Sequence, residues 1–250
     1  MKISVITVCF NSIATIADTL ASVGRQEHVE IEHIVIDGGS TDGTLAVIRS
    51  HATAPFRLVS EPDKGIYDAM NKGLSLASGD VVGFLNADDI FESATALSRI
   101  AGAVSAGADA VYGDLIYVGA SNPEIVVRYW RSGGFRRSRL RFGWMPPHPT
   151  FYARRSLLHE VGAFDTQLRV AADYDMMLRC LTRPGLVVSY LPEVLVRMRL
   201  GGASNASSGA MLRKSREDLL VMRKHRVGGW FTLASKNLRK LPQFLERRRP

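Results

Sequence analysis

The chain has 250 residues, 46% of them apolar, so it is long and apolar enough to bury a substantial core. Its 32 Lys and Arg exceed its 24 Asp and Glu, and the resulting formal net charge of +8 favours a partner that carries phosphate. Its two cysteines, Cys9 and Cys180, exclude a disulfide scaffold and a cysteine-rich zinc site, and they predict a reducing compartment. We recognise no signal peptide and no stretch that approaches the roughly 20 apolar residues of a membrane-spanning helix, so we expect a cytoplasmic protein.

The positive charge is concentrated in the last fifth of the chain. Residues 1–196 contain 18 basic and 21 acidic residues, for a net charge of −3, whereas residues 197–250 contain 14 basic and 3 acidic residues, for a net charge of +11. The Gly- and Ser-rich segment 201–209 predicts a flexible joint between these parts. We therefore expect a nearly neutral body of residues 1–200 and a cationic tail of residues 201–250.

In chain order, the first part of the body alternates predicted strands with predicted helices. Apolar, β-branched runs predict strands at 3–8, 31–36, 57–60 and 81–85. Helical periodicity predicts helices at 13–23, 41–50 and 66–77, with Ser12 as the cap of the first. This alternation is typical of βαβ units and of a parallel sheet covered by helices on both faces.

Beyond Ser93 the alternation weakens. We predict a helix at 95–106, strands at 110–112 and 125–129, a loop rich in Arg and Pro, and helices at 155–161 and 173–181. The predicted fold class is therefore α/β: a Rossmann-like, mixed, mostly parallel sheet flanked by helices, with a basic helical C-terminal tail. The second half is expected to face the substrate.

Polar clusters follow three predicted strands, at the end of the sheet where open α/β proteins bind ligands. They span residues 9–12, 37–44 and 86–89, and a fourth loop, 60–65, precedes a helix. Glycines in the second cluster allow close approach of a ligand, and Asp37 is placed to accept hydrogen bonds from a base or ribose, although an ordinary capped turn explains the cluster equally well. Neither Gly-x-x-x-x-Gly-Lys-Ser/Thr nor Gly-x-Gly-x-x-Gly follows the first strand, so we expect no classical ATP or NAD site.

Two pairs of carboxylates are candidates for the chemistry. Asp88 and Asp89 follow a buried strand, where paired carboxylates favour Mg²⁺ or Mn²⁺ shared with substrate phosphates, and a helix cap is the alternative. Asp173 and Asp175 open a predicted helix, where acidic residues also occur simply as partners of the helix dipole. Asp175, two residues after Asp173, points elsewhere on a helix, and we expect it to be structural.

Six segments occur in the order seen in family 2 glycosyltransferases of the GT-A fold, and the chain resembles that family over about residues 2–200. The segments are 6–8, 37–44, 60–73, 84–89, 147–152 and 172–175. The most specific is 60–73, Ser-Glu-Pro-Asp-Lys-Gly-Ile-Tyr-Asp-Ala-Met-Asn-Lys-Gly. The chain looks most like bacterial enzymes that build exopolysaccharides such as colanic acid and the sugar portions of glycolipids. The resemblance implies a GT-A-like catalytic domain, with a nucleotide-sugar half at about 1–115 and an acceptor half at about 116–200.

The resemblance also implies roles for individual residues. Asp173 matches the catalytic base, and Asp88 matches the ligand of Mn²⁺ or Mg²⁺. Two positions depart from the family pattern: Asn86 replaces the usual first Asp of Asp-x-Asp, and Ala172 stands where Glu is common. His148 either contacts the diphosphate, the metal or the acceptor, or is a buried structural histidine. The residues implied to bind the nucleotide sugar are Thr7, Asp37, Asp63, Lys64, Gly65, Asn86, Asp88 and Asp89.

These inferences predict an inverting glycosyltransferase of the hexosyltransferase type. It would move a sugar from a UDP- or GDP-sugar to a hydroxyl of a glycan or lipid-linked acceptor, in the synthesis of cell-surface polysaccharide or glycolipid. The chemistry agrees, because transfer needs a base on the acceptor hydroxyl and positive charge on the departing diphosphate.

Two alternatives come from other classes. A sugar-phosphate nucleotidyltransferase usually carries a Gly-rich, Arg-containing loop after its first strand, and this chain has Cys9-Phe10-Asn11-Ser12 there. The non-enzymatic alternative is a protein that binds anionic surfaces through its tail. No nucleic-acid-binding motif is present, so nucleic acid is not an expected partner.

The remaining basic residues have two interpretations each. Six arginines of the body either close over phosphate or are solvated: Arg136, Arg137, Arg139, Arg141, Arg197 and Arg199.

The tail contains a predicted amphipathic helix with a kink at Pro242. Its apolar face is formed by Leu233, Leu238, Leu241, Phe244 and Leu245, opposite Lys236, Arg239, Lys240 and Arg247. This pattern predicts either a peripheral helix on the anionic inner face of the cell membrane or a helix packed on the body.

Overall fold

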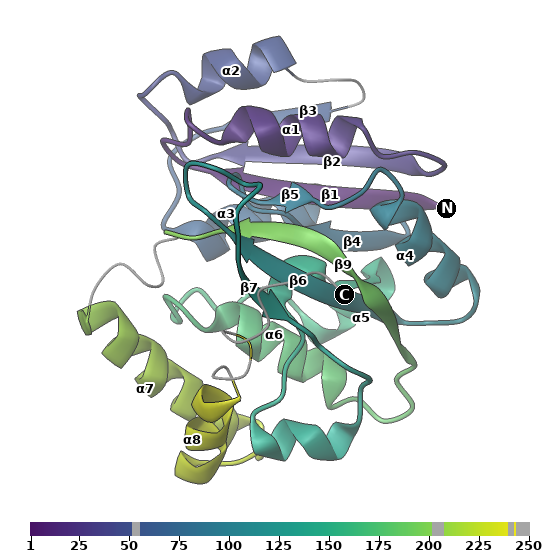
Figure 1. Ribbon diagram of the computed structural model, residues 1–250, viewed down its shortest axis with the longest axis vertical. Coiled ribbons are helices and arrows are strands. Elements are labelled where there is room, and N and C mark those ends of the chain that lie inside the picture. The colour runs from purple at the N-terminus through teal and green to yellow at the C-terminus, as the bar shows by residue number, and fades with distance from the viewer. Residues whose placement is uncertain (52–55, 202–207, 240–242, 244–250) are drawn as a thin grey trace.

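The computed structural model describes residues 1–51, 56–201, 208–239 and 243, which form one mixed sheet with helices on both faces (Figure 1). The strands are β1 (Lys2–Cys9), β2 (Glu30–Asp37), β3 (Phe56–Ser60), β4 (Val81–Phe84), β5 (Ile90–Phe91), β6 (Ala110–Val118), β7 (Val126–Trp130), β8 (Tyr152–Arg154) and β9 (Val188–Arg199). The α-helices are α1 (Ile16–Gly24), α2 (Thr44–His51), α3 (Ile66–Leu76), α4 (Ala96–Ser105), α5 (Arg155–Val161), α6 (Ala172–Leu181), α7 (Ser208–Lys224) and α8 (Trp230–Leu238). Two 3₁₀ helices are η1 (Arg137–Phe142) and η2 (His148–Thr150).

The described strands follow the order β3-β2-β1-β4-β8-β6-β9-β5, with β7 paired to β6. Strands β3, β2, β1 and β4 are all parallel, as are β6 and β9, whereas the pairings of β5, β7 and β8 are antiparallel. The predicted mixed, mostly parallel sheet is therefore confirmed. In the parallel part the carboxyl ends of β1, β2 and β4 meet at one edge.

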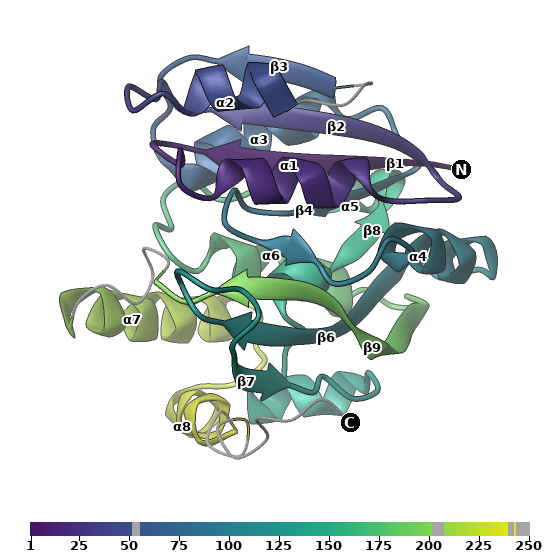
Figure 2. The ribbon, with the colours of Figure 1, turned by 45° about the horizontal axis from the view of Figure 1, so that its top comes forward.

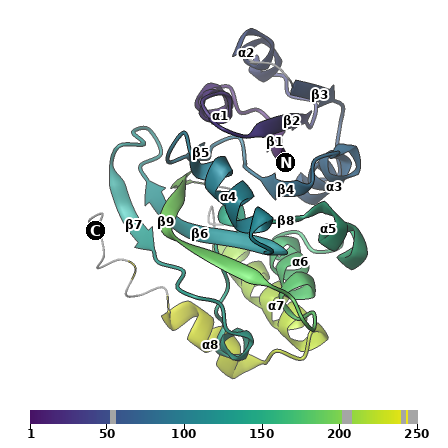
Figure 3. The ribbon, with the colours of Figure 1, turned by 90° about the vertical axis from the view of Figure 1, so that its right-hand side faces the viewer.

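The helices divide between the two faces of the sheet, as Figure 3 shows from the side. On one face, α1 and α4 pack on apolar residues of β1 and β4, and α1 and α2 pack on β2. On the other face, α3, α5 and α6 cover residues such as Ile6 and Ile36, and α7 and α8 extend the same core. Buried strands that are apolar on both faces explain why the sequence shows near-continuous apolar runs.

The first predicted helix differs in how it begins. It starts at Ile16, not Ile13, and the Ser12 side chain does not cap it. The Ser12 hydroxyl lies 3.3 Å from the Phe10 carbonyl, while the Ser12 carbonyl accepts the amides of Thr15 and Ile16. The start is displaced because Asn11 adopts a left-handed conformation (φ 48°) and redirects the chain.

The sequence analysis did not predict three of the strands, β5, β8 and β9. Strand β9 contains Pro192, which argues against a strand interior, but Pro192 lies where the β6–β9 register shifts, between the pairs Tyr112–Tyr190 and Asp114–Val194. Strands β5 and β8 have two and three residues, too short for a visible period of two.

The tail packs against the body in its described part, and α7 and α8 lie at the end of the molecule opposite α2 and β3 (Figure 2). Leu233 is buried, and the hydroxyls of Thr232 and Ser235 donate to the carbonyls of Arg141 and Phe142 at 2.8 and 2.9 Å. Lys236 faces the body at Tyr174, whose ring centroid lies 3.6 Å from Nζ, and pairs with Asp218 of α7 at 2.8 Å, which agrees with the alternative of a helix packed on the body. The predicted positions Lys240, Leu241, Pro242, Phe244, Leu245 and Arg247 lie outside the described residues.

In the part of the chain that the structure covers, each helix is too short or too polar to cross a lipid bilayer.

Candidate active site

Three loops meet at the carboxyl edge of the parallel strands. Cys9 pairs with Asp37 across β1 and β2, and Ile6 pairs with Phe84 across β1 and β4, so the loops after these strands start side by side. Asn11 joins the first two loops: its amide donates to the Ser40 hydroxyl at 2.8 Å, and its Oδ1 accepts the Thr41 amide at 2.9 Å. The predicted convergence of polar clusters is thus present.

Asp37 lies at the tip of β2 and is fully buried. Its carboxylate accepts the Ser40 hydroxyl and amide, the Gly39 amide at 3.2 Å and the Ser60 hydroxyl at 2.8 Å. Burial opposes ionisation, but these hydrogen bonds together lower the pKa of Asp37. Thr7 is also fully buried and lies 3.0 Å from His33 Nε2. Both side chains therefore lie behind the surface that they were expected to line, and Asp37 holds the loop in shape.

The surface in front of Asp37 is formed by Phe10, Gly38 and Asp63. A Cβ atom at Gly38 would lie 2.4 Å from an Asp63 carboxylate oxygen and 3.5 Å from the Phe10 ring, so only glycine fits between them. Phe10 is 63% exposed, so its ring is accessible to a ligand. The sequence analysis included Phe10 in the cluster 9–12 but did not predict it as a site residue.

Lys64 and Gly65 lie next to this surface, between β3 and α3. Gly65 is the N-cap of α3 with φ 117°, a conformation that favours glycine, and its amide donates to Asp63 at 2.8 Å. The Lys64 side chain is exposed, and its amide donates to Asp68 at 3.0 Å. The loop therefore holds Asp63 in position and leaves the Lys64 ammonium in solvent beside it.

The segment Asn86–Asp89, which follows β4, contains buried acceptor oxygens that no hydrogen-bond donor of the described residues reaches. Asp89 is fully buried, and its Oδ2 accepts a hydrogen bond from Asn86 Nδ2 at 3.3 Å. Asn86 Oδ1 and Asp89 Oδ1 are buried without a hydrogen-bond partner. Burial, and then the charge of Asp88, raise the pKa of Asp89 well above its usual range. Unpaired buried acceptors at this position indicate a site for a cation or for donor groups of a ligand.

Asp88 is half-buried, and burial raises its pKa although the nearby Arg199 opposes the rise. Arg199 itself is buried, donates to the Asp88 carbonyl at 3.3 Å and pairs with Asp18. Arg197 pairs with Glu92 and, at 2.9 Å, with Glu124. These two arginines fasten β9 to its neighbours, so the interpretation that they close over phosphate is wrong for this structure.

Asp173 lies in the first turn of α6 and is half-buried. Its Oδ1 accepts the Tyr174 amide at 2.8 Å and lies 3.2 Å from the Tyr67 hydroxyl, which also contacts the Val170 carbonyl at 2.8 Å. Tyr67 belongs to α3 in the donor half, so its hydroxyl connects that half to the start of α6. Sequence reasoning did not mark Tyr67, although it lies within the specific segment 60–73.

His148 and Asp173 line the same narrow cleft of about 10 Å³, together with Phe84 at the end of β4. The His148 ring stacks on Phe84 at 5.9 Å, and its Nε2 is buried without a partner. Burial lowers the pKa of His148, and the Asp173 charge opposes that change. The Asp173 carboxylate and the His148 imidazole thus line one cleft beside Phe84, which precedes Asn86 by two residues.

Asp175 plays a different part from Asp173, as expected. It is fully buried and lies 2.9 Å from Arg179, 3.0 Å from Lys224 and 2.8 Å from His225. Burial opposes ionisation, but these partners hold its pKa well below the usual range. The prediction that Asp175 is structural is confirmed, and its partners show that it anchors α7.

Residues 1–51, 56–201, 208–239 and 243 contain no group of three His, Cys, Asp or Glu side chains suited to hold a metal ion. Mg²⁺ commonly combines one or two carboxylates with waters and phosphate oxygens, so a single carboxylate such as Asp88 is compatible with a cation shared with a substrate.

Comparison with known proteins gives consistent results. The profile of Glycosyl transferase family 2 matches residues 4–162. A "PGL/p-HBAD biosynthesis glycosyltransferase" of Mycobacterium tuberculosis is 35% identical over 208 residues, covering 81% of this chain and 78% of the relative.

Two solved structures share the fold. S. aureus TarS 1-349 in complex with UDP-GlcNAc superposes with a TM-score of 0.66 at 22% identity, covering 99% of this chain and 72% of that one. The mannosyltransferase PcManGT from Pyrobaculum calidifontis, in complex with GDP-Man and Mn²⁺, has a TM-score of 0.66 at 19% identity, covering 97% and 72%.

Proposed function

The chain belongs to glycosyl transferase family 2, and on that premise we propose that it transfers a sugar from a nucleotide-diphosphate sugar to an acceptor hydroxyl, with inversion at the anomeric carbon. The observation that carries the proposal is the half-buried Asp173 carboxylate, held by Tyr67 in a cleft beside the end of β4. A carboxylate at this position can take the proton from an acceptor hydroxyl that attacks a sugar bound at the adjacent Asn86–Asp89 segment. Single displacement inverts the anomeric centre.

The donor nucleoside is proposed to bind on the surface of Phe10, Gly38 and Asp63. Phe10 offers an exposed ring for stacking, and Asp63 offers a carboxylate oxygen to base or ribose donors. Lys64 and Gly65 then lie beside the nucleoside or the diphosphate. Thr7 and Asp37 support this surface from behind, so the donor half of the site falls within residues 1–115.

A divalent cation, Mn²⁺ or Mg²⁺, is proposed to bind at Asp88 together with the diphosphate. The fit rests on the buried, unpartnered oxygens of Asn86 and Asp89 beside the half-buried Asp88 carboxylate. Such an ion supplies positive charge to the departing diphosphate. His148 is proposed to contact the diphosphate or the acceptor through its unpartnered Nε2.

The acceptor is proposed to be a glycan or lipid-linked glycan of the cell surface, bound mainly by residues 116–200. The mycobacterial relative is named for PGL/p-HBAD biosynthesis, which supports a glycolipid acceptor. Exposed Trp230 and Phe231 and the cationic tail support a peripheral position on an anionic membrane.

The proposal is tested with UDP-, GDP-, TDP- and CMP-sugars, with and without Mn²⁺. A ligand at 100 times its dissociation constant stabilises a protein by about 2.7 kcal/mol, so the true nucleotide should raise the melting temperature by a few degrees. The selected donor should then release its nucleotide in the presence of acceptor. Failure of every nucleotide to stabilise the protein would contradict the proposed donor site, and Asp173→Asn provides the inactive control for turnover.

A further inference from the structure

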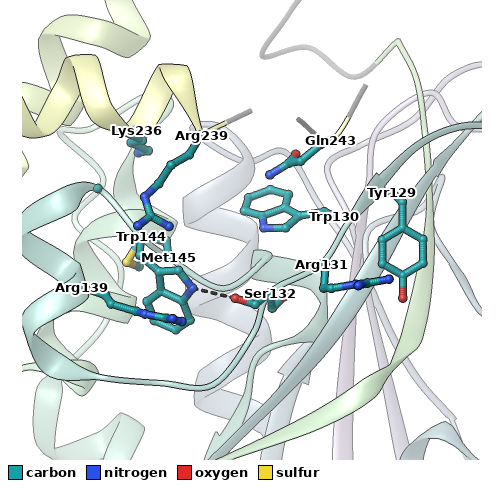
Figure 4. Close-up of a pocket in the computed structure, with 11 residues that line it drawn as sticks. Tyr129, Trp130, Arg131, Ser132, Arg139, Trp144, Met145, Lys236, Arg239 and Gln243 are labelled. Atoms are coloured by element: carbon teal, nitrogen blue, oxygen red, sulfur yellow. Dashed lines mark hydrogen bonds between the residues drawn. The ribbon is translucent and has the colours of Figure 1, made fainter. Parts of the chain in front are cut away.

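A second cavity, of about 300 Å³, lies between β7, the segment 131–145 and α8 (Figure 4). Its walls include Trp130, Arg131, Arg139, Trp144, Lys236 and Arg239. It is distinct from the cleft of Asp173 and His148, and the roles assigned above leave it unused. Its size is within the range of small-molecule sites.

The cavity carries cations that the described protein does not neutralise. No described carboxylate lies within ion-pair distance of Arg131, Arg139 or Arg239. Arg139 donates to the Gly134 carbonyl at 3.0 Å, and Arg131 lies 5.6 Å from the Tyr129 ring centroid. Guanidinium groups that have no carboxylate partner are suited to bind an oxyanion through charge-assisted, bidentate hydrogen bonds.

The buried carboxylates near this cavity already have partners. Asp114 accepts the Tyr129 hydroxyl at 2.9 Å, the Tyr190 hydroxyl at 2.8 Å and the Ser132 amide at 2.8 Å. Asp218 pairs with Lys236 at 2.8 Å. Among the described residues, these carboxylates therefore do not compete with an external anion for the three arginines.

Aromatic rings form the rest of the wall. Trp144 is fixed by its Nε1–H, which donates to the Ser132 carbonyl at 2.8 Å, and it packs on Tyr112 with a centroid distance of 5.5 Å. Trp130 is partly exposed in the cavity, and Figure 4 shows it between Arg239 and Arg131. Outside the cavity, the exposed rings of Phe142 and Phe231 pack edge to face with a centroid distance of 6.3 Å. Apolar surface therefore lies within and beside the cationic cavity.

Residues that line the cavity lie next to residues at the Asp173 cleft, although no described residue lines both. Lys236 Nζ lies 3.6 Å from the ring centroid of Tyr174, the residue after Asp173. Met145 lines the cavity, and two prolines separate it from His148 in the cleft. The cavity therefore lies near the start of α6, which carries the carboxylate proposed as base.

We propose that this cavity binds the anionic group of the acceptor, and that the acceptor is a phosphate-bearing amphiphile. Arg139 and Arg239 hold the phosphate, Arg131 adds positive charge on the other side of Trp130, and Trp130 contacts the attached apolar portion. That the ligand is an acceptor rests on the proposed function. The cavity and its positive charges are observed whether or not that function is correct.

The test measures binding by calorimetry, without donor, using dodecyl phosphate, dodecyl maltoside and inorganic phosphate below micellar concentrations. The parent protein should bind dodecyl phosphate at least about tenfold more tightly than either of the other probes. The double variant Arg131→Gln, Arg139→Gln should lose at least about tenfold in affinity for dodecyl phosphate. Because these arginines are partly exposed, the parent's affinity should also fall as salt rises.

The matched control is Arg136→Gln, Arg137→Gln, which removes the same charge from exposed positions of the same segment outside the cavity. Equal losses in both double variants would overturn the proposal, as would equal binding of dodecyl phosphate and dodecyl maltoside. Inorganic phosphate that binds as tightly as dodecyl phosphate would reject the apolar part of the site.

UDP and GDP are titrated into the same variants. Their affinities should not change, and a loss parallel to that of dodecyl phosphate would assign the cavity to the donor and overturn the proposal. Binding of dodecyl phosphate by a protein that binds no nucleotide would instead contradict only the proposed function.

Discussion

The donor side and the acceptor side of the site are built in different ways. On the donor side, Asp37 holds Ser40 three residues away, and Asn86 contacts Asp89 three residues away. On the acceptor side, Glu217 of α7 accepts the amides of Val170 and Ala171, 46 or 47 residues earlier, just before α6 begins. Local motifs therefore shape each donor-side loop, with Asn11 and Ser60 joining the loops to one another, whereas the tail positions the helix that carries Asp173. Changes in the tail should alter turnover without altering donor binding.

The largest effect is expected for Asp173→Asn. It keeps the size of the side chain but removes the proton acceptor, so turnover should fall by about 10²- to 10⁴-fold while donor affinity stays the same. The measurement is turnover beside the dissociation constant of the donor. Glu160→Gln, at an exposed carboxylate on α5, is the control and should retain parental turnover. If Asp173→Asn keeps more than about a tenth of the turnover, Asp173 is not the base.

Asp175→Asn should act on stability. It leaves Arg179, Lys224 and His225 without their buried anion, so the free energy of unfolding should fall by about 3 kcal/mol, measured by urea denaturation. Because the folded-state pKa of Asp175 is depressed below 3.8, its contribution is present above that pH and is lost as the pH falls toward the folded-state pKa. The variant should therefore show a weaker loss of stability in acid. An unchanged acid profile would argue against this anchor.

Asp88→Ala tests the donor side. Calorimetry should show that Mn²⁺ strengthens nucleoside diphosphate binding by the parent, and that the variant loses this enhancement by about tenfold or more. The melting temperature serves as the folding control. If the metal still enhances binding as in the parent, the cation lies elsewhere.

Glu217→Gln tests the link from the tail to the site. The Glu217 carboxylate accepts hydrogen bonds from three backbone amides. The glutamine side chain of the variant has only one acceptor oxygen for them, so the start of α6 should be held less firmly. We expect turnover to fall about tenfold with no change in the donor's dissociation constant. Loss of donor affinity in parallel would show that the two sides are not independent.

The smallest effect concerns membrane attachment. Replacing Trp230 and Phe231 by Ser should reduce co-sedimentation with anionic vesicles several-fold, because both side chains are exposed on α8. Deletion of residues 230–250 is a less specific test, since it also removes Leu233 and Lys236 from the body. Ile125→Ser, at an equally exposed apolar residue in another loop, is the control. Equal sedimentation of all variants would reject a membrane role for α8.

Family membership favours the glycosyltransferase prediction over a nucleotidyltransferase or a non-enzymatic surface-binding protein. That class could be read from the sequence because the segments at 37–44, 60–73 and 84–89 combine turn glycines with fixed polar residues. Their conformations depend on neighbours a few residues away, so spacing alone carries the information. Phe10 and Tyr67 were missed because an aromatic residue looks the same in sequence whether it packs in the core or faces a ligand.

The sequence by itself determined the alternation of strands and helices through Phe84, the loops at the carboxyl edge and the identity of the carboxylates, because apolar periodicity and turn chemistry act locally. The tertiary structure alone decided that Pro192 lies in a strand, that Arg199 pairs with Asp18, that Lys236 turns inward to Asp218, and that Arg131, Arg139 and Arg239 surround one cavity. Each of these outcomes depends on a partner distant in the chain. A long cationic side chain is equally compatible with solvent, a membrane or a buried carboxylate until its partner is in place.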